Sequence, residues 1–559
     1  MIRRDFIRTV AALGTSASSS SEPAEHRAAL TSIPDEPHVF VREDFHHLSG
    51  LAPPLTLADI TKTVDLLVGT SVDTLIFSLG STGGMCLYDT RVGQMHGTNV
   101  GKWTHAVNYR DGRYVRQLVA NGWDRPQLFC DRCHETGLLF FASAPLTIGA
   151  HTTPQLRGLG RTSDFVFDNA QLQVGPDADP RARHLSPTRL SFMFPEVRQE
   201  RIRIYEEFLS RYETDGVEVE VNWLPLCKYS QIRQCAPLLM QWFRDLRQLA
   251  QKAQQAQHRR KRIYVQLPAS PATWQQAGLE VGTWIAERLV DGLICTANDP
   301  EVLDQDLDLS EAVSLCRGTP CRILVGCGPS LGKIRAKKAT TKMLWAAAAN
   351  AYQQQAAGFG LNDMIRSQEL SFLGNMVHAL RPLRRPQLLE MVDKLYRVRD
   401  QPTNPQTAGT GLPGTEPLLP KVLEQGQPQE VPLRIADDLH RWHALGRVKR
   451  VRLRVRISNL EPSLNELRIE LNGRLLPDSL LQIHDLNYRF IREGVAYQGS
   501  QIYEYALRPE VYPQMGRNIV KVTLIRRDPD VDLRCEIQDV DCLIEYRLHR
   551  HFEDGPTTY

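Results

Sequence analysis

The chain has 559 residues, of which 42% are hydrophobic and 23% are charged, and its 67 Lys and Arg residues nearly balance 64 Asp and Glu residues. This composition is that of an ordinary globular protein, and the length exceeds what one compact core usually holds. A net charge of +3 does not favour nucleic acid as a partner. No run of about 18 apolar residues predicts a membrane span, and the 11 cysteines are too scattered to predict a disulfide framework.

The first residues resemble a twin-arginine export signal. Arg3 and Arg4 precede Phe6, a weakly apolar stretch and a run of small residues. Residues 1–28 are therefore set apart from the fold. If this signal is functional, we expect a periplasmic or extracellular protein; the alternative is a cytoplasmic protein with an N-terminal tail.

Residues 36–398 alternate short apolar runs with longer amphipathic segments, which is typical of repeated βα units. The runs predict strands at residues 74–79, 138–143, 216–222, 262–267, 292–295, 321–325 and 358–361, with helices at 196–212 and 232–257. An eighth strand is expected near residues 189–193 or hidden in the pattern. Eight such strands predict a (β/α)8 barrel. An open doubly wound sheet is the alternative, although no glycine-rich phosphate motif follows an early strand.

The C-terminal part of the chain has a different pattern. Residues 401–430 are rich in Pro, Gly, Thr and Gln and are expected to form a linker. Residues 431–552 contain several short strands with strict alternation, and Asn472 and Gly473 form a typical hairpin turn. This pattern predicts an accessory β-sandwich domain.

The strand expected at residues 216–222 carries the chemistry. Its alternation places Glu218, Glu220 and Asn222 on one face, which in a barrel is the interior. Two carboxylates about 7 Å apart disfavour each other's ionisation, which suits general acid/base catalysis. The alternative is that each carboxylate is held by an Arg or Lys of a neighbouring strand. Trp223 is expected to stack on a sugar ring or, alternatively, to pack in the core.

Residues 215–223, DGVEVEVNW, resemble the DGIELDF-type strand of a family of bacterial glycoside-hydrolase-like (β/α)8 proteins. Further similar segments are found in order between residues 45 and 370, among them 72–80, 87–93, 266–271 and 356–363. The resemblance implies hydrolysis of a carbohydrate, with Glu220 and Glu218 at the positions of the family's two acidic residues.

Three departures from the family's pattern bear on activity. Trp223 stands where the family has Arg, and residues 144–148 replace an Arg-Met-Asn-Asp motif, with His151 nearby. The seventh strand ends without a carboxylate, so Asp363, at the end of the last strand, is the substitute for a second acidic group. The further residues expected to bind substrate lie at strand ends or in the loops after them: Tyr88, His96, His151, Gln266, Asn298 and Asn362. For each of them, the alternative is a loop residue that only satisfies nearby backbone groups.

Two other features of the sequence resemble binding sites. Cys130, Cys133 and His134 have the spacing of metal ligands, but no second Cys/His pair lies nearby, so neither a metal nor a cofactor is expected. The row Arg450, Arg452, Arg454 and Arg456 would suit an anionic polysaccharide or, alternatively, a solvated sheet face.

The sequence therefore predicts a glycoside hydrolase that acts on a poly- or oligosaccharide, with no nucleic acid partner and no membrane span. Glu220 is the candidate general acid/base, and Glu218 or Asp363 is the second carboxylate. The alternative is a non-catalytic glycan-binding or scaffold protein on a degenerate barrel. A polysaccharide lyase is disfavoured, because no Tyr or His base beside an Arg or metal is evident.

Overall fold

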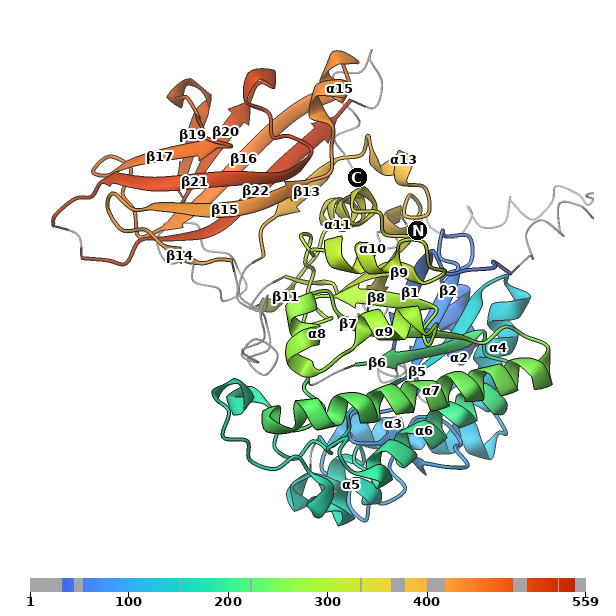
Figure 1. The fold of residues 1–559 in the computed structure, drawn as a ribbon. Helices are drawn as coiled ribbons and strands as arrows, with labels where there is room; N and C mark the ends of the chain where they lie inside the picture. The colour runs from blue at the N-terminus through green and yellow to red at the C-terminus, as the bar shows by residue number, and fades with distance from the viewer. Residues whose placement is uncertain are drawn as a thin grey trace, which may run out of the picture.

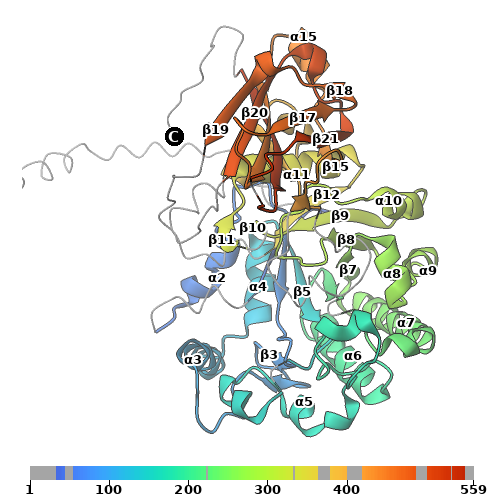
Figure 2. The same ribbon diagram turned by 90° about the vertical axis from the view of Figure 1, so that its left-hand side faces the viewer.

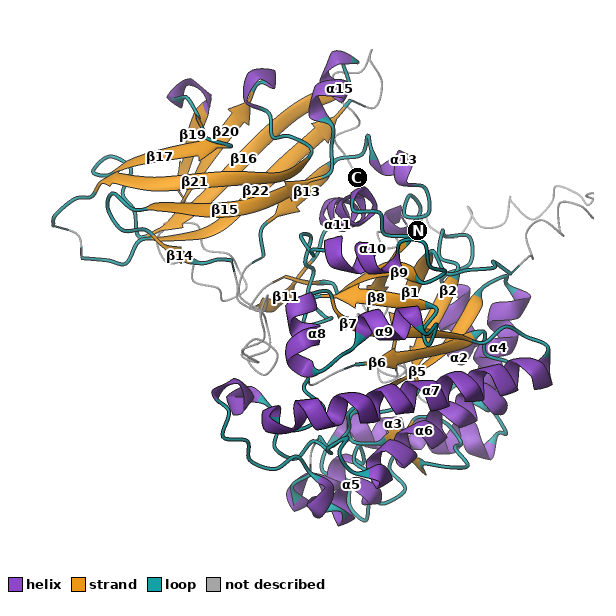
Figure 3. Cartoon of the chain, in the orientation of Figure 1, coloured by secondary structure: helices purple, strands orange, loops and turns teal. Residues whose placement is uncertain are grey.

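The computed structural model comprises a barrel encircled by helices and a domain of β-sheets at its flank (Figures 1–3). It describes residues 33–44, 54–150, 152–221, 224–331, 334–362, 378–399, 418–485, 500–530 and 532–547. The predicted export signal and most of the predicted linker lie outside these residues. In the described part of the chain, no helix is both long and apolar enough to cross a membrane.

Eight parallel strands pair side by side into a closed barrel, which confirms the predicted barrel. Their order around the barrel is β1, β2, β5, β6, β7, β8, β9 and β12, so each strand pairs with its neighbours along the barrel sequence. The strands are β1 (Val39–Glu43), β2 (Thr74–Ser78), β5 (Leu139–Pro145), β6 (Gly216–Glu220), β7 (Arg262–Pro268), β8 (Gly292–Thr296), β9 (Arg322–Cys327) and β12 (Gly358–Asn362).

Of the two expectations for the eighth strand, the position near residues 189–193 was wrong, and the strand is one that the sequence pattern hid. The missing strand is β1, and it precedes the other seven, whereas Leu190 makes only an isolated bridge to Gln173. All five residues of β1 are buried, but its apolar run is only three residues long and is followed by Arg42 and Glu43, so the sequence pattern did not mark it as a strand. Consequently β2, and not the first strand, corresponds to the run at residues 74–79.

Helices surround the barrel (Figure 3). The capping box at Thr56, in which the Asp59 carboxylate accepts from the Thr56 amide at 2.8 Å, begins the first of them. The helices are α2 (Leu57–Asp65), α3 (Ala106–Ala120), α4 (Arg125–Glu135), α5 (Asp164–Asp168), α6 (Pro195–Ser210), α7 (Ile232–Gln257), α8 (Pro271–Ala277), α9 (Val281–Ala286), α10 (Ser310–Cys316), α11 (Thr341–Gln353) and α13 (Pro386–Leu389). Two short strand pairs lie in the connections, β3 (Met85–Cys86) with β4 (Gln94–Met95) and β10 (Ser330–Leu331) with β11 (Ile334–Lys338).

An apolar cluster fills the barrel interior below its carboxyl end. Its members are buried side chains from six strands: Phe40, Ile76, Leu139, Phe141, Tyr264, Ile294 and Leu324. Phe40 fits because β12 has Gly360 beside it, where a Cβ would lie 2.4 Å from the phenyl ring. The interior is therefore a packed core, and Glu220 and Asn362 finish their strands at its carboxyl end.

The C-terminal domain contains two mainly antiparallel sheets whose buried side chains form one hydrophobic cluster. One sheet has the order β13-β22-β16-β20-β19, with β14 also paired to β22, and the other has the order β15-β21-β17-β18. Their bounds are β13 (Lys394–Arg397), β14 (Lys421–Val422), β15 (Pro428–Ile435), β16 (Val448–Ser458), β17 (Glu466–Leu471), β18 (Arg474–Leu475), β19 (Leu481–Asp485), β20 (Ser500–Leu507), β21 (Gly516–Arg526) and β22 (Glu536–Tyr546), with helix α15 (Leu439–Ala444) beside them.

The two domains share a connected junction. β13 falls within residues 36–398, the range expected for the barrel, yet it pairs with β22 of the C-terminal domain. Gln305 of the barrel donates to the Leu395 carbonyl of this strand at 3.0 Å. Arg434 of β15 pairs with Asp306 at 2.7 Å. Figure 2 shows the C-terminal domain seated directly on this side of the barrel.

Candidate functional site

The two glutamates of β6 both lie at the carboxyl end of the barrel. Glu218 contacts Ser143 of β5, and both glutamates contact Arg42 of β1. The side chain of Glu218 is fully buried, whereas 19% of the Glu220 side chain is exposed. Within the pair, only Glu220 therefore reaches solvent.

Arg42 crosses the interior to reach this pair. β1 and β6 are separated by β2 and β5 in the barrel wall, so the guanidinium spans the barrel and does not come from an adjacent strand. Its Nη2 lies 2.6 Å from a carboxylate oxygen of Glu220, and its Nε lies 3.5 Å from one of Glu218. One guanidinium therefore faces both carboxyl groups, and its positive charge offsets the cost of burying acidic side chains here.

Glu218 is set up to retain its proton. Burial raises the pKa of Glu218, the positive charge of Arg42 opposes this rise, and the negative charge of Glu220 adds to it. The Ser143 hydroxyl donates to Oε2 of Glu218, which favours the charged form. The net direction is upward, so Glu218 binds its proton more tightly than a solvated glutamate does.

Several buried oxygen atoms near this end of the barrel have no hydrogen-bond donor among the described residues. They are Oε1 of Glu218, Oε1 of Gln266 on β7, Oδ1 of Asn298 after β8 and Oδ1 of Asn362 at the end of β12. Burying an acceptor without a donor costs free energy, so such groups normally meet a partner. A ligand rich in hydroxyl groups supplies donors of this kind.

The remaining predicted residues fall into two groups. Asn222, Trp223, His151 and Asp363 lie outside the described residues. Tyr88 and His96 are described, and both are buried.

Tyr88 packs against the helices that surround the barrel. Its hydroxyl donates to Glu207 of α6 at 2.6 Å, and its ring meets that of Tyr212 edge to face. The loop after β2 folds back onto α6, so Tyr88 serves packing in this structure. His96 lies in the same loop with its ring 6.2 Å from that of Trp103.

Sequence reasoning missed Arg42 and Ser143. Arg42 was overlooked because β1 itself was overlooked; the signal was the short run Val39–Glu43, in which Val39 and Val41 face the helices and Phe40 faces the interior. Ser143 lay within a predicted strand, but nothing in a single sequence shows that β5 and β6 align it with Glu218.

The residues Cys130, Cys133 and His134 and the arginine row of β16 take part in contacts within the fold. Cys130 and Cys133 are buried, and burial raises the pKa of Cys133, while His134 pairs with Asp215 at 2.9 Å. Among the described residues, no group of His, Cys, Asp and Glu could hold a metal ion. The arginine row of β16 is matched by carboxylates of β22 and β20, with Arg450 and Glu545 2.7 Å apart and Arg454 and Asp541 2.6 Å apart.

No protein-family model matches the chain, and no curated protein matches it in sequence. Among solved structures, the chain is similar to the glycoside hydrolase domain of PgaB (BpsB) from Bordetella bronchiseptica, with 13% identity and a TM-score of 0.40, over 62% of this chain and 99% of that one. It is also similar to α-L-fucosidase isoenzyme 2 from Paenibacillus thiaminolyticus, with 10% identity and a TM-score of 0.39, over 64% of this chain and 51% of that one.

A GH18 chitinase from Pseudoalteromonas aurantia is similar with 9% identity and a TM-score of 0.33, over 61% of this chain and 100% of that one. These proteins share a distant likeness in fold. The chemistry of the present site is therefore interpreted from its own residues.

Proposed function

We propose that this protein is a glycoside hydrolase that acts on a poly- or oligosaccharide, with Glu220 as the general acid/base. The observation that carries the proposal is the partial exposure of Glu220 at the carboxyl end of β6, beside a buried second carboxyl group and buried oxygens that lack donors. Substrates of barrel enzymes bind at this end.

Each group of the site has a distinct task in this proposal. Glu220 donates a proton to the oxygen of the leaving sugar, and Arg42 positions its carboxyl group from across the barrel. The side chain of Glu218 is fully buried, and its proposed task is to set the charge around Arg42. Asp363, which directly follows Asn362 at the end of β12, is proposed as the second carboxylate that attacks the sugar or activates water.

The acceptor oxygens of Gln266, Asn298 and Asn362 are proposed to receive hydroxyl protons of the substrate. Asn222, Trp223 and His151 remain proposed substrate contacts. The C-terminal domain is proposed to be an accessory β-sandwich, and the N-terminal segment an export signal. Membership of the bacterial family with the DGIELDF-type strand is likewise a proposal that rests on residues 215–223.

A non-catalytic glycan-binding barrel is the second candidate. It is favoured by one specific observation: Arg42 lies against both carboxylates of β6, as in a purely structural ion pair. In that case the site would bind a sugar through its acceptor oxygens without breaking it.

A measurement of substrate hydrolysis distinguishes the glycoside hydrolase from the non-catalytic glycan-binding barrel. Purified protein is screened against polysaccharides and aryl glycosides, in parallel with Glu220→Gln. We expect hydrolysis of at least one substrate and a loss of about 10²- to 10⁴-fold in kcat for the variant. Binding without turnover on any substrate would favour the non-catalytic candidate, and equal turnover by Glu220→Gln would remove Glu220 from the mechanism.

A further inference from the structure

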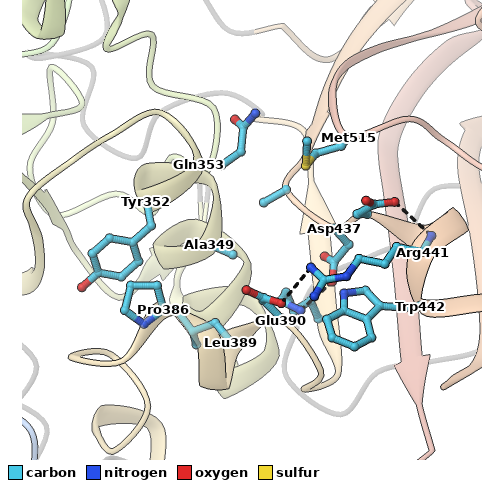
Figure 4. A pocket seen from close by; sticks show the side chains of 13 residues that line it. Ala349, Tyr352, Gln353, Pro386, Leu389, Glu390, Asp437, Arg441, Trp442 and Met515 are labelled. Atoms are coloured by element: carbon cyan, nitrogen blue, oxygen red, sulfur yellow. Dashed lines mark hydrogen bonds and ion pairs between the residues drawn. The ribbon is translucent and has the colours of Figure 1, made fainter. Parts of the chain in front are cut away.

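A cavity of about 350 Å³ lies between the barrel and the C-terminal domain. One wall comes from α11 and α13 of the barrel flank, and the other from β13, the residues just after β15, and α15. Figure 4 shows Tyr352 and Ala349 of α11 on one side and Trp442 and Arg441 of α15 on the other. The volume falls within the range of cavities that bind small molecules.

This cavity is separate from the Glu220 site. Its lining residues on α11 are Ala349, Tyr352 and Gln353, which belong to the last part of that helix. The chain then passes directly to Gly358, the first residue of β12. The cavity therefore lies toward the amino ends of the barrel strands, whereas Glu220 lies at their carboxyl ends.

A buried ion pair forms the floor. Lys394 and Asp437 are each 1% exposed, and their charged atoms lie 2.7 Å apart. The hydroxyl groups of Tyr396 and Tyr546 both donate to Asp437. Lys394 also donates to the Val392 carbonyl at 3.1 Å. Because these partners fix both charged groups, the floor is rigid before any ligand arrives.

The open side of the cavity carries aromatic side chains next to charged groups of both signs. The guanidinium of Arg441 lies 4.6 Å from the centre of the Trp442 ring and 3.5 Å from a carboxylate oxygen of Glu390. Tyr352 and Met515 also line the cavity, and Met515 is 56% exposed. Apolar faces next to exposed carboxylate and guanidinium groups are complementary to a sugar ring, which has an apolar C–H face and a rim of hydroxyl groups.

The charges of the lining disfavour an anionic ligand. Three carboxylates, those of Glu390, Asp437 and Asp438, stand against the two cations of Lys394 and Arg441. Asp437 and Lys394 satisfy each other, and Arg441 is paired with Glu390. An anionic ligand would meet a slight excess of negative charge, so charge complementarity is poor for it.

We infer that the cavity between α11, α13 and α15 is a second carbohydrate site that binds a short neutral oligosaccharide. Glu390 and Arg441 hydrogen-bond its hydroxyl groups, and Tyr352 and Met515 contact its apolar face beside the largely buried Trp442 ring. The site does not depend on catalysis by Glu220, because it lies at the other end of the barrel.

The test uses the full-length Glu220→Gln variant, in which hydrolysis of the probe is suppressed. Cellotetraose, xylotetraose, mannotetraose and maltotetraose are titrated by calorimetry. We then add Glu390→Gln and Arg441→Gln together, since both side chains are exposed and neither carries the fold. We expect at least one probe to bind. The double substitution Glu390→Gln with Arg441→Gln should lower the affinity of one class of binding sites about tenfold or more.

Glu311→Gln with Arg317→Gln on and after α10 makes the same charge changes at exposed positions away from the cavity, and it should leave binding unchanged. Two outcomes would overturn the inference: no oligosaccharide probe binds, or binding is unchanged by Glu390→Gln with Arg441→Gln. Failure of the wild-type protein to hydrolyse any sugar would leave these binding results intact, so the two proposals fail separately.

Discussion

Arg42, Glu218 and Glu220 show how a barrel can bury two acidic side chains at one end of a strand. Glu218 lies deeper and is screened from solvent, and Glu220 lies nearer to the mouth. The sequence was sufficient to place both carboxylates on one face of β6, because strand alternation is strict. It was not sufficient to find their partner, because Arg42 is 176 residues from Glu218 and meets it only when the barrel closes.

The proton of Glu218 gives a prediction for stability. Its pKa is raised by burial, so the native state binds more protons than the unfolded chain between the ordinary and the raised pKa. The stability of the wild-type protein therefore falls as pH rises through that window. The glutamine of the Glu218→Gln variant cannot ionise, so the stability of this variant does not fall for this reason as pH rises. We expect its stability relative to wild type to increase with pH and then to level off.

Urea unfolding from about pH 4 to about pH 8 measures this difference. Glu206→Gln, at an exposed position of α6, is the matched control. If the stability of Glu218→Gln relative to wild type instead stays constant or falls as pH rises, Glu218 does not hold its proton in the folded state.

Among the elements, β1 illustrates what a single sequence hides. The seven strands with clear apolar runs were predicted, whereas in β1 the apolar run stops at Val41 and is followed by Arg42 and Glu43. The strand order of the C-terminal sheets was equally hidden, because β13 joins β22 across the predicted linker. Pairing of this kind depends on contacts between distant parts of the chain.

The fit between β1 and β12 is testable at Gly360. A Cβ at this position would lie 2.4 Å from three atoms of the Phe40 ring. Because the ring is enclosed in the barrel interior, we expect Gly360→Ala to lower the free energy of unfolding by about 1–3 kcal/mol. Denaturant unfolding of the variant and the wild-type protein measures this loss of stability.

Gly282→Ala in α9 is the control for Gly360→Ala, since its nearest neighbour would be Leu315 at an ordinary 3.5 Å. Alanine suits a helix better than glycine, so this variant should be unchanged or more stable by up to about 1 kcal/mol. Equal effects at the two positions would contradict the proposed packing of Phe40 against Gly360.

At the scale of the whole molecule, the C-terminal domain is joined to the barrel by paired charges. Burial raises the pKa of Asp306, and Arg434 of β15 opposes this rise at 2.7 Å. Removing the guanidinium would leave the carboxylate without its cation. The second cavity lies in this same boundary, so a stable junction is a condition for the proposed sugar site.

A double-mutant cycle tests this junction. We expect Arg434→Gln to lower the free energy of unfolding by about 1–3 kcal/mol, because a charged hydrogen bond is lost. Asp306→Asn should recover part of the loss when it is combined with Arg434→Gln. Equilibrium unfolding of the four proteins gives the coupling; strictly additive effects would mean that this pair does not join the domains.

The central claim is that Glu220 protonates the leaving sugar oxygen, and its most direct test is the dependence of kcat on the leaving group. Wild type and Glu220→Ala are compared on aryl glycosides of the sugar that the screen identifies, from a poor leaving group to dinitrophenyl. We predict a loss of about 10²- to 10⁴-fold with the poor leaving group and a much smaller loss with dinitrophenyl, which departs without a proton. The same loss across the whole series, or no loss at all, would contradict the assignment.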